Sequence, residues 1–325
     1  MKYKNLKQNK EFLVWRGAML NKALCIFEIF RISGRKVTLQ VPTSEDFFNK
    51  QRIEHLLKEL NNLSFDEFYL ICEKETIFSY LKLFINNLKC FGKKIILVSL
   101  GFDLYDYIDF IKGKIDLIVF CFNECSSCGS YIKGFTQLSK VLEENIPVIV
   151  NIDISIIDTN AIDYITNNIK NIGIKSAYFN FLINKKECIE DIFNNRSEDN
   201  YISFEKVYKE IEDICDKNEI KMMLDLHSKS NEITGCCGGK NLIHINSLGQ
   251  IFPCPFIEQS SLAMRFSEKW VPGNLERCLE KNKMFAEINN IRYGVFRYNT
   301  CLARASIFSK CNNLLSKDPI TEMFK

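Results

Sequence analysis

Short apolar runs alternate with amphipathic segments along most of the chain. Continuous apolar runs of the kind that form buried strands lie at 35–42, 65–72, 93–101, 115–122, 147–155, 176–184 and 220–227. Apolar residues at helical spacing lie at 48–63, 76–92, 104–113, 134–145, 159–173 and 204–219. Strands that are apolar on both faces and separated by helices are typical of a parallel sheet covered by helices.

This alternation predicts an α/β fold, built as a partial parallel βα barrel or, alternatively, as a doubly wound sheet. In both architectures ligands bind at the carboxyl ends of the strands. The pattern changes near residue 229, where a small, polar segment begins. We therefore expect an N-terminal helical extension (1–34), a barrel (35–228) and a small cysteine-containing domain (229–325).

The C-terminal part contains a hairpin with cysteines at both ends. The stretch CCGGKNLIHINSLGQIFPC runs from Cys236 to Cys254, and its apolar and polar residues alternate on both sides of a Leu-Gly turn. This pattern predicts two antiparallel strands. Because a hairpin brings its ends together, we expect Cys237 and Cys254 to converge, as ligands of an iron–sulfur cluster or of zinc do. The alternative is that these thiols only fill a small core.

The composition and charge of the chain bear on its partners and its location. The chain has 325 residues, 46% of them hydrophobic, and a net charge of +3 from 43 basic and 40 acidic side chains. This balance predicts neither a nucleic-acid partner nor a membrane surface. The sequence has no apolar run of about 18 residues and no apolar signal region, so a cytoplasmic location is expected. In that reducing compartment the 14 cysteines are not expected to form disulfides.

In order and spacing, residues 35–325 resemble the radical S-adenosylmethionine (SAM) enzymes that modify peptides and carry a C-terminal SPASM domain. The spacing of Cys237, Gly249 and Cys254 is similar to the start of that domain. PGNLERCLEK (272–281) resembles its GN segment, and the segment that begins CLARA at Cys301 resembles its C-terminal part.

The barrel segment carries the same resemblance. IKGFTQLSKVLEENIPVIVNI (132–152) is similar to the family's stretch after the fourth strand. LICEKETIF (70–78) and VSLG (98–101) occupy the positions of the family's GGEP and TNG segments on strands two and three. The resemblance implies a radical-SAM-like partial barrel, and as partner either a precursor peptide or an active radical SAM homologue.

The chain departs from the family at the site of SAM chemistry. The family's C-x3-C-x2-C loop after strand one reads VPTSEDFFNK (41–50) here, without a cysteine. The GGEP position reads Glu73-Lys74-Glu75-Thr76. These side chains would obstruct the close approach that the family's glycines allow. The resemblance therefore implies a degenerate member that does not bind SAM in the usual place.

The resemblance further implies a single auxiliary 4Fe-4S cluster. Its ligands would be Cys237, Cys254 and Cys301, with Cys236, Cys311 or an outside group as the fourth. The family's other ligand positions hold different residues here, namely Ile288, Ile291, Arg297 and Thr321. A structural zinc site on the same cysteines is an alternative.

A second cysteine motif and the histidines complete the candidates. Cys121, Cys125 and Cys128 have C-x3-C-x2-C spacing, but after the fourth expected strand. They leave open an active radical SAM enzyme with a relocated cluster, although buried or spare thiols are the simpler interpretation. The histidines, which are His55, His227 and His244, are interpreted as structural or surface residues.

The leading hypothesis from the sequence is an accessory or peptide-binding component of a peptide-maturation system, possessing a radical-SAM-like fold and one cluster. It leaves open whether the chain is an enzyme. No catalytic residue is assigned.

Overall fold

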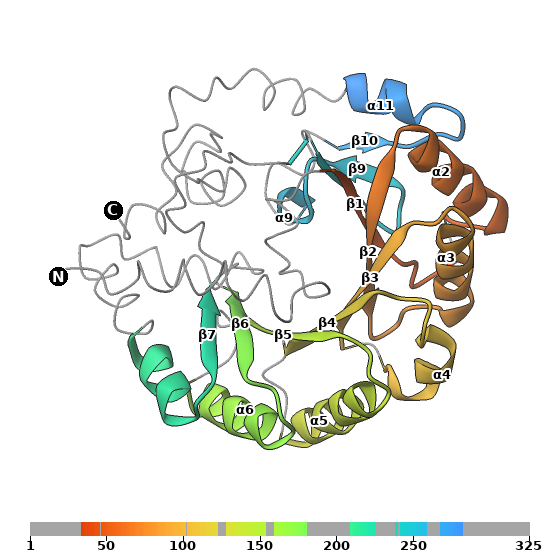
Figure 1. The fold of residues 1–325 in the computed structure, drawn as a ribbon. Coiled ribbons are helices and arrows are strands. Elements are labelled where there is room, and N and C mark those ends of the chain that lie inside the picture. Colours follow the sequence, from red (N-terminus) through yellow and green to blue (C-terminus); the bar gives the residue numbers. More distant parts are fainter. Residues whose placement is uncertain are drawn as a thin grey trace, which may run out of the picture.

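The structure is a computed structural model. It describes residues 34–45, 47–101, 103–122, 128–153, 159–180, 209–224, 238–239, 241–258 and 267–281. The strands in these residues are β1 (Arg35–Gln40), β2 (Phe65–Glu73), β3 (Lys94–Leu100), β4 (Leu117–Phe122), β5 (Val148–Asp153), β6 (Ser176–Asn180), β7 (Lys221–Leu224), β8 (Leu242–Ile245), β9 (Gln250–Phe252) and β10 (Glu268–Lys269). They form one sheet in the order β10-β9-β8-β1-β2-β3-β4-β5-β6-β7, which curves around the molecule as a partial barrel (Figure 1). Strands β1 to β7 pair in parallel in chain order, as the sequence predicted.

Helices cover the outer face of this sheet (Figure 1). They are α2 (Lys50–Asn62), α3 (Phe78–Cys90), α4 (Ile108–Ile111), α5 (Cys128–Glu143) and α6 (Thr159–Asn171), together with a helix at 209–217 before β7. Two further helices follow the hairpin, α9 (Pro255–Glu258) and α11 (Leu275–Lys281). Helix α9 differs from the others because it lies inside the curve of the sheet (Figure 1).

The local sequence explains the long helices. In α2, Asn49 caps the first turn by accepting a hydrogen bond from the Arg52 backbone N–H at 3.0 Å. The helix buries Ile53, Leu56, Leu57 and Leu60, which recur at helical spacing. The single helix expected at 104–113 is shorter than predicted, because a 3₁₀ turn (Tyr105–Tyr107) precedes α4. Its Asp and aromatic residues favour a helix weakly, so packing sets its form.

Strand alternation divides the side chains of the sheet between two faces. Val37 of β1 and Phe68 of β2 lie opposite each other and belong to the hydrophobic core beneath the helices. Since successive side chains of a strand point to opposite faces, Thr38 and its neighbour Tyr69 face the inside of the barrel. The pairing of Thr38 with His244 places His244 on the same inner face.

The cysteine-flanked hairpin is confirmed, and it is part of the barrel sheet. Strand β8 pairs in parallel with β1, from Lys36 opposite Leu242 to Leu39 opposite Ile245. Strand β9 then pairs antiparallel with β8, and β10 antiparallel with β9. The expected domain boundary near residue 229 and residues 1–33 lie outside the described residues, so the division into domains stays a prediction. The strands on the two sides of that boundary nevertheless share one sheet.

A carboxylate on α2 fixes the segment that resembles the GN segment. Glu59 accepts hydrogen bonds from the backbone N–H groups of Gly273 and Leu275, each at 2.7 Å. The Leu275 N–H is the first backbone donor of α11 and has no partner within the helix, and Gly273 lies in the turn two residues before it. The contact joins residues more than 200 positions apart in the chain.

We predict that Glu59→Ala destabilises the protein by about 2 kcal/mol, because two backbone donors lose a charged acceptor. Urea unfolding followed by circular dichroism measures the change. The control is Glu54→Ala on the same helix. Its exposed pairing with Lys50 spans 3.9 Å, and its loss is expected to cost less than about 0.5 kcal/mol. Equal losses in the two variants would contradict the anchoring role.

Candidate functional site

The ends of β1, β2 and β8 meet at the carboxyl edge of the barrel. Gln40, the last residue of β1, donates from Nε2 to Glu73 Oε1 at the end of β2, at 2.7 Å. Its Oε1 accepts from the backbone N–H of Ser247, in the hairpin turn after β8, at 3.1 Å. One amide side chain therefore joins the barrel edge to the turn between the two cysteines.

Behind this edge, a buried polar network connects β1, β8 and α9. The side chain of His244 is 2% exposed. Its Nδ1 lies 2.9 Å from Thr38 Oγ1, and its Nε2 lies 2.7 Å from Glu258 Oε2. The second carboxylate oxygen of Glu258 accepts from Asn246 Nδ2 at 2.6 Å. Each polar group of the network thus has a partner, as burial requires.

The charge state of Glu258 follows from these contacts. Burial alone would raise the pKa of its carboxyl group. The hydrogen bond from His244, the charge of His244 and the hydrogen bond from Asn246 outweigh burial, and the net effect lowers the pKa below its usual value of 4.5. The folded protein therefore favours the carboxylate form.

The burial and hydrogen bonds of His244 fit the structural role expected of it, whereas Glu258 was not among the residues singled out from the sequence. The sequence contains only a weak sign of the contact between the two residues: His244 occupies an inner-face position of the hairpin, and Glu258 ends the turn that follows Cys254. His55 is exposed on α2, as expected. His227 lies outside the described residues.

Cys254 lies between the hairpin and α9, and it is 4% exposed. The backbone N–H of Gly239 donates to the carbonyl of Pro253 at 3.0 Å, and to that of Leu242 at 2.8 Å. The backbone two residues after Cys237 therefore contacts the residue immediately before Cys254. This geometry fits the expected convergence of the two hairpin ends and is compatible with a shared ligand site.

The rest of the expected ligand set cannot be placed. Cys236, Cys237, Cys301 and Cys311 lie outside the described residues. In the part of the chain that the structure describes, no three His, Cys, Asp or Glu side chains form a group suited to a metal ion. The ligand set stays a prediction.

The segment after β2, Glu73 to Thr76, forms a tight turn. The Glu73 backbone N–H donates to Thr76 Oγ1 at 2.8 Å, and the Thr76 N–H donates to the Glu73 carbonyl at 3.0 Å. Lys74 and Glu75 are exposed, whereas Glu73 is half-buried. Glu73 also forms a backbone bridge with Gly101, just after β3. The two segments that correspond to GGEP and TNG therefore lie side by side.

The second cysteine motif is only partly described. Cys121 is 6% exposed near the end of β4 and accepts a hydrogen bond from Asn151 Nδ2 at 3.7 Å. It lies on the inner face, opposite Leu100 and Asn151 in the neighbouring strands. Cys125 and the side chain of Cys128 lie outside the described part, so a cluster on these three residues stays a hypothesis.

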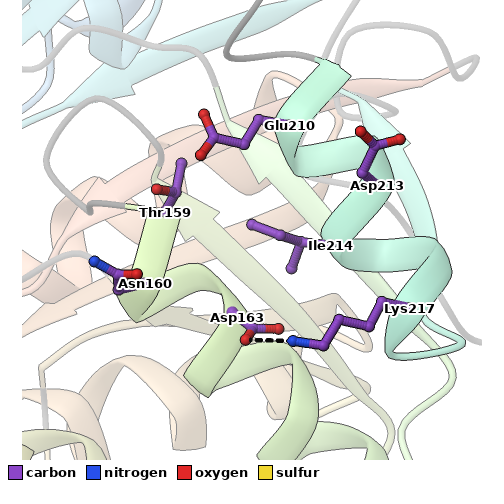
Figure 2. A pocket seen from close by; sticks show the side chains of 7 residues that line it. All are labelled: Thr159, Asn160, Asp163, Glu210, Asp213, Ile214 and Lys217. Atoms are coloured by element: carbon purple, nitrogen blue, oxygen red, sulfur yellow. Dashed lines mark hydrogen bonds and ion pairs between the residues drawn. The ribbon is translucent and has the colours of Figure 1, made fainter.

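A pocket of about 310 Å³ lies elsewhere, between α6 and the helix at 209–217 (Figure 2). It is lined by Thr159, Asn160, Asp163, Glu210, Asp213, Ile214 and Lys217. Lys217 pairs with Asp163 across it at 2.8 Å, and Asn218 also donates to Asp163 at 2.8 Å. These two hydrogen bonds lower the pKa of Asp163. The pocket lies between outer helices and contains none of the candidate residues.

Among the helices that the structure describes, none is long and apolar enough to span a membrane. No protein-family model matches the sequence, and no curated protein matches it.

Solved structures do match the chain. SuiB from Streptococcus suis, crystallised with S-adenosylmethionine, superposes with a TM-score of 0.63 at 9% identity, over 98% of this chain and 88% of SuiB. SuiB bound to its precursor peptide SuiA gives 0.58 at 8% identity, over 89% of this chain and 72% of SuiB. The enzyme anSMEcpe with bound AdoMet gives 0.61 at 12% identity, over 89% and 94% of the two chains.

These neighbours are radical SAM peptide-modifying enzymes. At such low identity the likeness establishes the fold alone. The predicted fold class is confirmed, because the mixed α/β architecture and its parallel sheet match those of radical SAM enzymes. The SPASM-like nature of the C-terminal part stays a prediction.

The Glu258 network predicts a pH dependence of stability. Because folding lowers the pKa of Glu258, its stabilising contribution is present above the unfolded pKa and is lost as the pH falls through the folded pKa. The wild-type protein should therefore lose stability more steeply than Glu258→Gln between about pH 5 and pH 3. Urea unfolding at several pH values measures the slopes.

The control for this pH series is Glu54→Gln, whose side chain is 43% exposed. It is expected to keep the wild-type slope. A Glu258→Gln slope equal to that of wild type would contradict the assigned role of the carboxylate.

Replacement by alanine should destabilise the protein to different extents at two glycines, one in the hairpin turn and one before α11. Gly249 and Gly273 both have positive φ, at 71° and 83°. A Cβ at position 249 would overlap the ring of Phe47, whereas nothing lies within 4 Å of one at position 273. Gly273→Ala should cost about 1 kcal/mol from backbone strain, and Gly249→Ala at least about 2 kcal/mol more. Equal shifts in the urea midpoint would show that Phe47 can move aside.

Proposed function

We propose that this protein is a degenerate relative of the radical SAM peptide-modifying enzymes, and that it acts as an accessory, peptide-binding component of a peptide-maturation system in the cytoplasm. The observation that carries the proposal is a radical SAM fold whose segment after β1 has no cysteine. That segment, 41–50, lies where the family binds its catalytic cluster. Without the three thiolates, SAM has no iron to bind there.

The turn after β2 supports the same conclusion. Glu73 and Lys74 stand where the family has its two glycines. Glu73 is half-buried and its carboxylate already accepts the amide of Gln40, while Lys74 is exposed. A ligand approaching the backbone at this edge would meet these side chains. Two of the solved neighbours were crystallised with a peptide, SuiA for SuiB and Cp18Cys for anSMEcpe. Peptide binding therefore fits a barrel that has lost its SAM site.

We further propose that the hairpin retains one 4Fe-4S cluster, with Cys237, Cys254 and Cys301 as ligands and Cys236 as the nearest fourth. The contact between Gly239 and Pro253 supports this, because it brings the two ends of the hairpin together. Such a cluster would supply electron transfer or a structural cross-link. Zinc on the same thiolates would supply only the cross-link.

An active enzyme is the second candidate function. It would hold its cluster on Cys121, Cys125 and Cys128. The position of Cys121, on the inner face near the end of β4, favours this candidate function. The burial of Cys121 and its hydrogen bond with Asn151 fit equally well with a packed core thiol.

The experiment that separates these possibilities is the measurement of iron and acid-labile sulfide after anaerobic purification. We predict about four irons per chain in the wild type, lost in the double variant Cys237→Ala with Cys254→Ala. Zinc without sulfide would favour the structural zinc site. Iron that persists in the double variant but disappears in Cys125→Ala with Cys128→Ala would favour the relocated cluster.

The accessory role is tested on the same preparations. Incubated with SAM and a reductant, the iron-loaded protein is expected to form no 5′-deoxyadenosine. Its formation would overturn the proposal in favour of the enzyme.

A further inference from the structure

We infer that Glu258 is a positioning residue for the thiol of Cys254, which it holds in place through His244 and Asn246. The inference concerns the geometry of this chain, and it rests on the proposed function only for what the thiol would bind. Nothing in the sequence pattern connects Glu258 with the cysteines.

Helix α9 is too short to be stable on its own. It is a single turn of four residues, Pro255–Glu258, and it begins immediately after Cys254. Its first hydrogen bond runs from the Ile257 N–H to the Cys254 carbonyl at 3.2 Å. A lone turn of this length is unstable in water, because nucleation fixes several dihedral angles for one hydrogen bond. Contacts outside the turn must therefore hold it.

Glu258 supplies such contacts at the far end of the turn. Both of its carboxylate oxygens are engaged, one by His244 at 2.7 Å and one by Asn246 at 2.6 Å. His244 is itself fixed on its other side by Thr38 of β1. The end of α9 is thus connected to β1, and α9 is held inside the curve of the barrel (Figure 1).

The other side of Cys254 has its own restraint. The Pro253 carbonyl accepts the N–H of Gly239, next to the segment that carries Cys237. The cysteine therefore lies between two anchors, one on the residue before it and one at the end of the turn after it. Loss of the second anchor would free α9 while leaving the hairpin strands paired.

The test is the rate at which N-ethylmaleimide alkylates each cysteine of the full-length, metal-free protein, measured by peptide mass spectrometry. Cys254 is 4% exposed in the intact network. In Glu258→Ala we expect its alkylation to accelerate about tenfold, because local opening exposes the thiol. Glu258→Gln keeps one acceptor oxygen for His244, so a smaller acceleration is expected.

Two other buried cysteines of the chain report on global unfolding in the same experiment. Cys72 is fully buried in β2, and Cys215 is 1% exposed in the helix at 209–217. Both are expected to stay protected in both variants. The matched control is Glu144→Ala, which breaks the exposed pair between Glu144 and Lys112 and should leave Cys254 protected.

The inference is overturned if Cys254 stays protected in Glu258→Ala. It is also overturned if Cys254 opens in Glu258→Gln only together with Cys72 and Cys215, since that result indicates a general structural role. If the alanine variant does not fold, the alkylation rates of Cys254, Cys72 and Cys215 in Glu258→Gln provide the test.

A second measurement connects the anchor to the proposed cluster. In iron-loaded Glu258→Gln, with the cluster reduced by one electron with dithionite, we expect an electron paramagnetic resonance spectrum that differs from that of the wild type at unchanged iron content, if Cys254 is a ligand that the substitution shifts. If the wild type binds no iron, the proposed cluster fails, whereas the alkylation result still decides the role of Glu258.

Discussion

The parallel pairing of β1 with β8 is the constraint on which the rest of the carboxyl edge depends. It places Thr38 beside His244, although the two residues are 206 positions apart in the chain. From this pairing follow the position of the hairpin turn beside Gln40 and the position of α9 inside the barrel. Closing so long a loop is entropically costly, and the buried area and hydrogen bonds of the paired strands offset the cost.

The polar network explains how this pairing is made specific. Apolar residues of β8 pack into the core on the outer face of the sheet. If the pairing of β8 with β1 slipped by one residue, His244 would turn away from Thr38 and Glu258. A buried histidine and a half-buried carboxylate without partners would be unfavourable. The network therefore favours one register, and with it one position for the segment that carries Cys254.

The same fold is compatible with loss of the family's chemistry. The sheet and its helices are stabilised by the outer core, whereas SAM binding depends on a few residues in the loops at the carboxyl edge. The proposed loss would leave the core in place, because the cysteine-free segment 41–50 still contributes Val41 and Phe48 to it. A barrel of this kind can keep a peptide-binding surface after its catalytic loop has changed, which is the basis of the proposed accessory role.

The sequence by itself determined the strands, the longer helices, their parallel order and the hairpin, because the periods of two and 3.6 residues are local signals. It could not determine which strand the hairpin would join, nor the bonds of Glu258 to His244 and of Glu59 to the start of α11. Those contacts depend on the tertiary structure, since a buried polar side chain finds its partner only when distant segments are brought together by the packing of the apolar core.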